Sequence, residues 1–335
     1  MHIYRHLDEL PSSPGPAVAT IGNFDGVHRG HRWVIENVLA RARAAGLRSL
    51  VITFDPHPAR AIRPGQSPQL ITPCQQKLDL LSQTGVDEVL VLPFNGDLAR
   101  MSAQQFAQEI LRQKLNIVEL HEGENFRFGR GAEAGIDTLK SLAPELGLTV
   151  FSYPPQHLHG DTVSSSRIRT LITAGDLAAA RRLLGRPFSV RSTPASGRGY
   201  GTRYTVPTIN LAPYPELLPA HGVYITQLRI GPTPTATSGS DPVSSLEPAA
   251  ETFDAVTNIG NRPTFGADSF TVESHLLNFH PIDLTPDTPL ELCFLHRLRD
   301  EQRFPTPEAL LAQIKQDVAK AQRYLGLLHR FQTSP

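Results

Sequence analysis

The sequence predicts an α/β domain built on a parallel sheet, followed by a small antiparallel β-barrel with a terminal helix. Three observations support this fold class. Short apolar runs alternate with helical patterns in the first half, β-branched and aromatic runs lie between glycine and proline turns in the second, and an amphipathic helical pattern closes the chain. The length of 335 residues fits two domains. We place them at residues 1–185 and 186–335, because Gly185 and Pro187 end a short helical segment there.

The first domain is predicted to alternate strands with helices. Strands are expected at residues 17–21, 50–54, 89–92, 117–120 and 148–151, and helices at 32–45, at 72–81 and from 102 onward. Thr72 and Ser102, each followed three residues later by glutamine, predict capping boxes at two of the helix starts. Strand–helix alternation implies right-handed crossovers and a parallel sheet covered on both faces. Ligands of such sheets bind beyond the carboxyl ends of the strands.

The second domain is predicted to be mainly β-structure. Strands are expected at residues 222–226, 255–259 and 270–276, after a helix at 177–184 that Asp176 caps. Residues 231–249 are rich in proline, threonine and serine and are predicted to form a mobile loop. The terminal helix is expected at residues 307–329. Its predicted apolar stripe consists of Leu310, Leu311, Ile314, Val318 and Ala321.

The composition excludes several classes of protein. Lysine plus arginine and aspartate plus glutamate both number 32, so the chain lacks the basic surplus of a general nucleic-acid binder. No run approaches the roughly 18 apolar residues of a membrane span, and the amino terminus lacks the apolar region of a signal peptide. The only cysteines, Cys74 and Cys293, fall in different predicted domains. We therefore expect a cytoplasmic protein without a disulfide or a membrane partner.

The segment that follows the first predicted strand carries the first candidate site. It spans residues 22–31 and reads Gly-Asn-Phe-Asp-Gly-Val-His-Arg-Gly-His. Its glycines allow the backbone to approach a ligand closely, and the helix that begins there offers free N–H groups to an anion. His28 and His31 can donate to phosphate oxygens as negative charge develops. Taken alone, this histidine pair also fits a surface pair or two metal ligands.

A second polar segment precedes another helix far downstream. Residues 164–169 read Ser-Ser-Ser-Arg-Ile-Arg. Hydroxyls and backbone N–H groups followed by two arginines can clamp a polyphosphate. By itself the segment equally fits an ordinary helix cap followed by solvated arginines.

Together the two segments resemble the nucleotidylyltransferase superfamily, with its His-x-Gly-His and Ser-Ser/Thr-x-x-Arg signatures. Residues 53–58, 123–129 and 184–188 narrow the match, because in this order they resemble bifunctional riboflavin kinase/FMN adenylyltransferases, also called prokaryotic FAD synthetases. The resemblance spans nearly the whole chain. It implies a Rossmann-like nucleotidylyltransferase domain that makes FAD from FMN and ATP, and a kinase domain that makes FMN from riboflavin and ATP.

The resemblance also implies roles for particular residues. His28 and His31 would be catalytic by stabilising the transition state. ATP would contact Gly22, Asn23, Phe24, Asp25, Gly30, Ser164, Ser165, Arg167 and Arg169. Asn125, Phe126 and Phe128 would lie near the flavin, although core packing is the alternative for at least one of the two phenylalanines. Many relatives carry aspartate where this chain has Asn125, whose amide can still form hydrogen bonds. Mg²⁺ is expected to accompany the nucleotide.

The kinase site is implied by the second half of the chain. Residues 206–211 resemble the Pro-Thr-Ala-Asn motif of riboflavin kinases, so Thr208 and Asn210 would bind Mg²⁺ and ATP phosphate. Gly197 and Gly199 would belong to a loop over the phosphates, although a flexible turn is the alternative. Glu273 would be the base that deprotonates the riboflavin 5′-hydroxyl, rather than an exposed strand residue. Arg299 would either support the flavin or pair with a carboxylate.

Departures from the family pattern leave a second hypothesis open. Ile209 replaces a small alanine, residues 204–206 replace Leu-Gly-Phe, and residues 281–289 lack the usual Leu-Tyr-Gly. The alternative is therefore a monofunctional FMN adenylyltransferase whose degenerate kinase domain only binds flavin. A non-catalytic flavin or nucleotide sensor, and a transferase for a pantetheine or nicotinamide phosphate, are further alternatives. The intact polar residues weigh against a sensor, and the second domain weighs against another acceptor.

Overall fold

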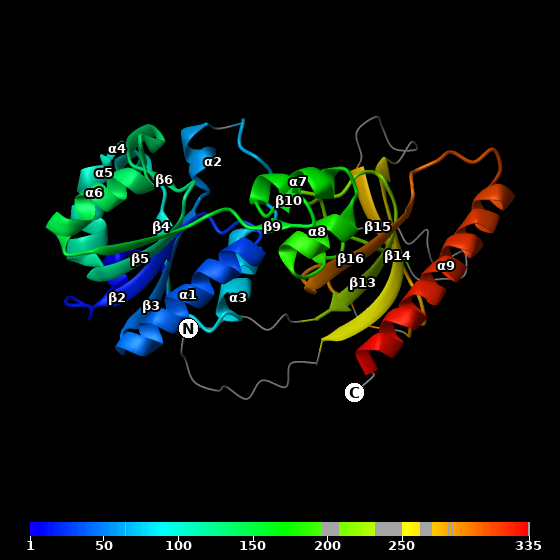
Figure 1. Cartoon of the computed structure of the whole chain (residues 1–335). Coiled ribbons are helices and arrows are strands. Elements are labelled where there is room, and N and C mark those ends of the chain that lie inside the picture. The colour runs from blue at the N-terminus through cyan, green and yellow to red at the C-terminus, as the bar shows by residue number, and fades with distance from the viewer. Residues whose placement is uncertain are drawn as a thin grey trace. The chain divides into compact units, whose positions relative to one another are not determined.

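The computed structural model describes residues 1–63, 65–195, 208–231, 250–261, 270–280, 282 and 284–333 (Figure 1). These residues form two compact units, and the chain passes from the first to the second between Arg167 and Ile168. The boundary predicted at residue 185 lies beyond this point, after α7 (Ser165–Thr173) and α8 (Leu177–Leu184). Helix α8 packs against strands of the second unit. The position of the functional boundary therefore stays a prediction.

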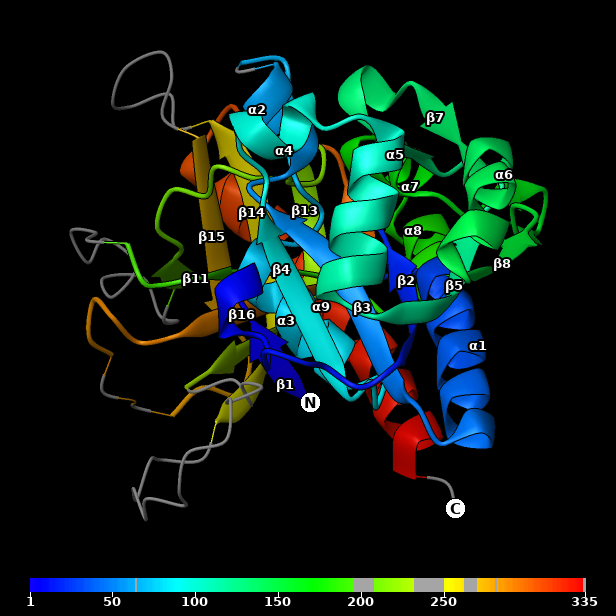
Figure 2. The ribbon, with the colours of Figure 1, turned by 90° about the vertical axis from the view of Figure 1, so that its left-hand side faces the viewer.

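The first unit is built on a six-stranded sheet that is parallel, as the sequence predicts, and that has one strand more than the five expected (Figure 2). In spatial order its strands are β1 (His2–Tyr4), β4 (Glu88–Pro93), β3 (Arg48–Asp55), β2 (Ala17–Ile21), β5 (Ile117–Gly123) and β8 (Thr149–Tyr153). The chain builds outward from β2 through β3 to β4 and then resumes on the other side of β2 with β5. This reversal of strand order creates a crevice between β2 and β5 at their carboxyl ends.

Helices cover both faces of this sheet. On one face lie α1 (Arg29–Ala45) and α3 (Cys74–Ser82); on the other lie α5 (Ala103–Gln105), the π-helix η2 (Phe106–Lys114) and α6 (Ile136–Leu146). The alternation of strand side chains divides the core between the two layers. Ala17, Ala19 and Ile21 pack with η2 and α6, whereas Val18 packs against α1. Short segments complete the unit: η1 (Leu7–Glu9), α2 (Pro58–Ile62) and α4 (Gly96–Arg100).

One of the two predicted capping boxes is present. The Ser102 hydroxyl accepts from the Gln105 N–H at 3.1 Å, and the Gln105 side chain accepts from the Ser102 N–H at 3.0 Å. The prediction at Thr72 is wrong, because α3 begins after Pro73 without a side-chain cap. The Thr72 hydroxyl is used elsewhere: it accepts from the Gly26 N–H at 2.9 Å. A tertiary contact has therefore replaced the local one.

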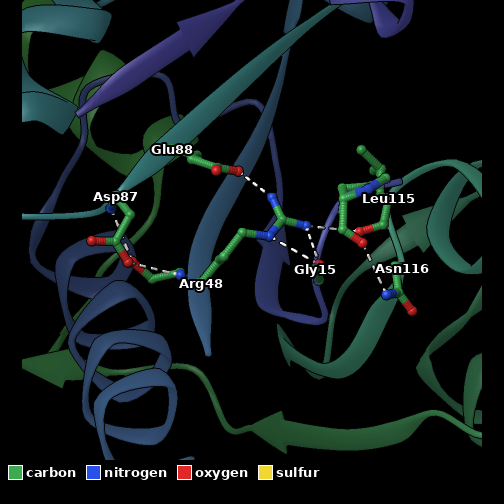
Figure 3. A network of polar contacts seen from close by, with 8 residues as sticks. Gly15, Arg48, Asp87, Glu88, Leu115 and Asn116 are labelled. Carbon is green, nitrogen blue, oxygen red and sulfur yellow. Dashed lines mark hydrogen bonds and ion pairs between the residues drawn. The ribbon is translucent and has the colours of Figure 1, made fainter. Parts of the chain in front are cut away.

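A polar network fastens the amino-terminal edge of the sheet, opposite the edge where ligands are expected (Figure 3). The guanidinium of Arg48 donates to the Gly15 carbonyl at 2.7 and 2.9 Å and to the Leu115 carbonyl at 3.1 Å, and it pairs with Glu88. Beside it the Ser49 hydroxyl donates to Asp87. These contacts join β3 to β4 and to the segments that precede β2 and β5, so they hold the amino-terminal ends of these strands together.

The chain between β5 and α7 forms two small hairpins. The first pairs β6 (Arg127–Phe128) with β7 (Ala134–Gly135) around the 3₁₀ turn η3 (Arg130–Ala132). The second pairs β9 (His157–Leu158) with β10 (Asp161–Thr162). The second hairpin leads directly into the serine-rich segment that opens α7. Its position therefore determines where the chain begins this segment.

The second unit contains a curled antiparallel half-barrel, which agrees with the predicted β-barrel (Figure 1). Its strands run in the order β11 (Phe188–Ser192), β16 (Leu290–Arg299), β13 (Gly222–Ile230), β14 (Glu251–Asn261), β15 (Phe270–Leu276) and β12 (Thr208–Asn210). Helix α9 (Pro307–Thr333) follows and lies along β14. Residues 232–249, for which a mobile loop is predicted, lie outside the described residues.

The packing stripe of α9 differs from the predicted one. Val318 and Ala321 pack against the sheet, and the stripe continues through Tyr324, Leu325 and Leu328. The predicted members near the start of the helix are instead exposed: Leu310 by 42%, Leu311 by 50% and Ile314 by 37%. Periodicity identified the helix correctly. It could not show that the apolar side chains of this helix pack against the barrel only from Val318 onward.

Candidate active sites

A cavity of about 630 Å³ lies at the carboxyl ends of the strands in the first unit. Its walls come from segments that are far apart in the sequence: the ends of β2 and β5, the start of α1, the first hairpin, and the loop before α7. The predicted residues that line it are Gly22, Asn23, Phe24, His28, Gly30, His31, Asn125, Phe126, Phe128, Ser164 and Ser165. The structure therefore brings together the two predicted phosphate segments and the predicted flavin segment.

The two histidines occupy the amino terminus of α1. His28 is the N-cap residue, and its Nδ1 accepts from the His31 N–H at 3.3 Å. The two rings stack with their centroids 3.6 Å apart and a 15° angle between the planes. An acceptor at Nδ1 leaves the proton of a neutral imidazole on Nε2. His28 is thus held in the tautomer whose Nε2 can donate to an anion.

The loop that carries these histidines is shaped by close contacts. Phe24 and Val27 adopt positive φ angles of 48° and 38°. A Cβ on Gly22 would lie 3.3 Å from the Phe24 ring, and one on Gly30 would lie 3.3 Å from the His28 ring. The absence of side chains at both glycines therefore lets the aromatic rings pack directly against the backbone beside the cavity.

Asp25 lies outside the cavity lining and supports the loop from behind. Its carboxylate accepts from the backbone N–H of Ile71 at 3.1 Å and of Thr72 at 2.9 Å, and from the Thr72 hydroxyl at 3.3 Å. The side chain is only 2% exposed. The carboxylate is therefore used to hold the loop in place, and a contact of Asp25 with ATP stays a prediction.

The serine-rich segment contacts both the cavity and the first motif. Ser165 donates to the Asp25 carbonyl at 2.8 Å, and Ser164 accepts from the Arg167 N–H at 3.3 Å. Arg167 and Arg169 are not among the lining residues. The Arg167 guanidinium instead pairs with Asp161 at 2.7 Å and so fastens the second hairpin to α7. The serines therefore reach the cavity, and a contact of either arginine with ATP stays a prediction.

The predicted flavin residues lie on the wall that follows β5. Asn125, Phe126 and Phe128 all line the cavity, and the two phenyl rings stack at 5.4 Å with a 14° angle between their planes. Phe128 is also 8% exposed and belongs to the hydrophobic core. Core packing, the alternative considered for one of the rings, thus applies to Phe128.

A buried lysine joins the carboxyl ends of β2 and β3 beneath the cavity. The Lys77 ammonium donates to the Thr53 hydroxyl at 2.9 Å, to the Phe54 carbonyl at 3.1 Å and to the Asn23 carbonyl at 3.3 Å. Burial lowers the pKa of Lys77. Sequence analysis missed this residue because a lysine within an amphipathic helix gives no local sign of burial.

Several residues that line the cavity were also not predicted, and Trp33, Glu122 and Tyr153 are the notable ones among them. Glu122 ends β5 and accepts from the Ile21 N–H at 2.6 Å, across the crevice between β5 and β2. Burial raises the pKa of this carboxyl well above its ordinary value. A signal was present in the sequence, because polar residues stand at 119, 121 and 122 within an otherwise buried strand.

In the second unit, strand register aligns the predicted kinase residues. Asn210 of β12 lies opposite Glu273 of β15, and Glu273 lies opposite Asn258 of β14. Thr208, two residues before Asn210, shares its face of the sheet. The intervening Ile209 is 6% exposed and points to the other face. The replacement of alanine by isoleucine therefore adds bulk to the core rather than to the polar row.

The remaining predicted residues of this site have other positions. Arg299 donates to Asp317 of α9 at 2.9 Å, and Asp317 is 2% exposed. Of the two roles considered for Arg299, the structure thus shows the carboxylate pair. Gly197, Gly199 and Thr205 lie outside the described residues. On the face of the sheet opposite Glu273, buried hydroxyls join neighbouring strands: Thr226 to Thr257 at 2.7 Å and Thr257 to Ser274 at 2.9 Å.

Fold and sites together define a class of protein: nucleotide-dependent transferases that join an α/β nucleotidyl-transfer domain to a β-barrel domain. Comparison with known proteins makes this specific. A model of FAD synthetase matches residues 10–167, and a model of riboflavin kinase matches residues 184–325. A bifunctional riboflavin kinase/FMN adenylyltransferase of Pseudomonas fluorescens is 34% identical over 96% of this chain and 97% of its own length. One from Escherichia coli (strain K12) is 31% identical over 98% and 99%.

The chain belongs to the bifunctional riboflavin kinase/FMN adenylyltransferase family. A solved structure also shares the fold across 96% of the chain and 98% of its own, with a TM-score of 0.80 and 25% identity. It is described as a macrolide-efflux protein from Streptococcus pneumoniae. In the part of this chain that the structure describes, no helix is long and apolar enough to cross a membrane.

Proposed function

We propose that the chain phosphorylates riboflavin to FMN at the barrel site and adenylylates FMN to FAD at the α/β site, using ATP for both reactions. The convergence of His28, His31, Ser164 and Asn125 on one cavity carries the adenylyl-transfer part of the proposal. These residues come from three distant segments and could meet only through the fold. Family membership over the full length supports the pairing of the two activities.

At the α/β site, a phosphate oxygen of FMN attacks the α-phosphorus of ATP. A new phosphorus–oxygen bond forms, the bond between the α-phosphorus and the bridging oxygen breaks, and pyrophosphate leaves with that oxygen. No covalent enzyme intermediate is needed, so positioning and charge neutralisation supply the catalysis. Nε2 of His28 and the amino terminus of α1 would donate to the phosphate oxygens as charge shifts to the leaving group. Asn125 and Phe126 would contact the flavin.

At the barrel site, Glu273 would accept the proton of the riboflavin 5′-hydroxyl while that oxygen attacks the γ-phosphorus of ATP and ADP leaves. Hydroxyl, amide and carboxylate oxygens are ligands that suit Mg²⁺. Thr208 and Asn210 supply the first two beside Glu273, so this donor set fits the ion. Bound there, Mg²⁺ would neutralise phosphate charge. Cys74 and Cys293, both free thiols, support the proposal of a reducing, cytoplasmic setting.

The test is a time course with purified protein, riboflavin, ATP and Mg²⁺, in which the flavins are separated by chromatography. The proposal expects FMN first and FAD later, with His28→Ala stopping at FMN and Glu273→Ala making FAD only from added FMN. If added FMN became FAD while riboflavin stayed unchanged, the protein would be the monofunctional enzyme with a degenerate kinase domain. If neither flavin reacted, the transferase proposal would be wrong.

A further inference from the structure

Two aromatic side chains form a corner of the cavity to which the reactions above assign no role. Trp33, in the second turn of α1, and Tyr153, at the end of β8, both line the cavity. Their ring centroids are 4.8 Å apart and the planes meet at 70°. In such an edge-to-face pair, the edge of one ring contacts a face of the other ring. The opposite face is then available to stack on a third ring. Both side chains are only partly buried, so the corner is open to a ligand.

A chain of hydrogen bonds fixes the Tyr153 side of this corner. The Tyr153 hydroxyl lies 2.6 Å from Nδ1 of His121, and Nε2 of His121 lies 2.8 Å from Glu119. Arg41 completes the chain with two bonds to the Glu119 carboxylate, at 2.7 and 2.8 Å. His121 is 1% exposed and lies outside the cavity lining. The chain thus runs from the protein surface at Arg41 to the cavity wall.

The charges along this chain give each hydrogen bond a direction. The hydrogen bond from Arg41 lowers the pKa of Glu119, which is therefore an anion, whereas burial lowers the pKa of His121 and keeps it neutral. Burial raises the pKa of Tyr153, so its hydroxyl keeps its proton. Tyr153 accordingly donates to His121, and His121 donates to Glu119. A buried polar chain in which every member is paired specifies one orientation of its side chains.

We propose that Trp33 and Tyr153 form a stacking wall for a planar heteroaromatic ring of a nucleotide substrate, and that His121 is the positioning residue that holds Tyr153 in place. The inference rests on the proposed function, which supplies the adenine of ATP and the isoalloxazine of FMN as such rings. Trp33 lies two residues after His31 on α1, whereas Tyr153 pairs with Gly123, beside the segment proposed for the flavin. The wall therefore adjoins both proposed subsites, and the experiment below decides between the two rings.

Separate calorimetric titrations of the full chain with Mg²⁺-ATP and with FMN test the wall. Trp33→Leu and Tyr153→Leu should each weaken binding of one ligand about tenfold, because base–aromatic stacking contributes roughly that much. The other ligand should bind as in the wild type, and the one affected identifies the ring. Phe151→Leu is the matched control, because Phe151 stacks on His121 at 4.9 Å but does not line the cavity.

The positioning role of His121 is tested through kinetics. His121→Leu should raise the KM of the same ligand while leaving the kcat of adenylyl transfer within about twofold, since the histidine acts only through the Tyr153 ring. His121→Gln can accept from Tyr153 and donate to Glu119, so it should restore the KM. Melting curves identify any variant that fails to fold. Tyr153→Phe then replaces that variant, because it keeps the ring but loses the hydrogen bond to His121.

Unchanged affinity for both ligands in both leucine variants would overturn the inference, as would an equal loss for both ligands. A fall in kcat without a change in KM in His121→Leu would also overturn it. These outcomes differ from failure of the proposed function itself, in which the wild-type protein would bind neither ligand. The single tryptophan gives a second readout, because the ligand that stacks on the wall should change Trp33 emission when it binds.

Discussion

The Ser165 hydroxyl donates a hydrogen bond to the Asp25 carbonyl over 2.8 Å, and this contact joins two motifs 140 residues apart. The Asp25 carboxylate in turn holds the Ile71–Thr72 backbone, so one residue connects α7, the loop before α1 and the loop before α3. A hydroxyl whose proton is directed to a protein carbonyl cannot donate the same proton to a phosphate. Ser165 therefore aligns the two phosphate segments rather than binding phosphate through that proton.

Ser165→Ala should accordingly have a modest effect. Loss of one hydrogen bond of this kind costs about 0.5–1.5 kcal/mol, which corresponds to roughly a two- to tenfold rise in the KM for ATP. The kcat for FAD formation should fall by no more than that factor. Initial-rate kinetics with FMN in excess provide the measurement. A loss of several hundredfold in kcat would mean that the hydroxyl acts on the transition state, against the alignment role.

His28→Ala should lower the kcat for FAD formation by about 10²–10³-fold, the usual cost of removing one donor that stabilises a transition-state anion. Riboflavin phosphorylation by the same preparation should continue at the wild-type rate, because the kinase residues lie on separate strands of the second unit. His28→Asn is the informative companion, since its amide can cap α1 without supplying the imidazole. If FMN production fell equally in folded protein, the assignment of separate sites would be wrong.

Glu273→Gln should lower the kcat of riboflavin phosphorylation by about 10²–10⁴-fold, because the amide keeps the shape of the side chain but cannot accept the proton. FAD formation from added FMN should be unaffected. Glu291→Gln is a control within the same barrel, where the carboxylate of β16 accepts from Ser189 at 2.8 Å and lies outside the proposed kinase row. Equal activity of Glu273→Gln and wild type would exclude Glu273 as the base.

The sequence was sufficient for the fold because apolar runs and turn residues act locally. It predicted the five longer strands of the parallel sheet but not β1, whose three residues include His2 and Tyr4 and make too short a pattern. His28, His31, Ser164 and Asn125 were found through motif spacing and do share a cavity. Lys77, His121 and Tyr153 could not be found in this way, because their roles depend on partners from other strands and helices.

Several polar residues near the sites have partners that no local pattern indicates. Thr72 matched a capping pattern, but its hydroxyl bonds to Gly26, and Asp25 matched a ligand motif, but its carboxylate satisfies buried backbone donors. In both cases the side chain bonds to a partner that is distant in the sequence, and not to the local partner that the pattern indicates. Arg299 is similar, since the buried Asp317 of α9 takes its guanidinium. Polar side chains near a site are thus the least predictable part of it.

Glu122 gives the stability of the α/β unit a dependence on pH. Burial raises its folded-state pKa well above the ordinary value of 4.5, at which the unfolded chain releases the proton. Between these two values the folded state binds more protons than the unfolded state, so the free energy of unfolding falls as the pH rises. Glu122→Gln cannot ionise, yet its amide oxygen can still accept from Ile21. We expect the variant to gain stability relative to the wild type as the pH rises.

Melting temperatures of both proteins at pH 5 and pH 8 measure this effect, because every other titrating group is shared and cancels in the difference. The gap between variant and wild type should widen in favour of the variant at pH 8. Glu124→Gln is the matched control, since Glu124 is exposed two residues further along and its substitution should leave the gap unchanged. If the melting temperatures of wild type and Glu122→Gln changed with pH by the same amount, the pKa of Glu122 would be the same in the folded and unfolded states. The buried carboxyl would then not destabilise the sheet at neutral pH.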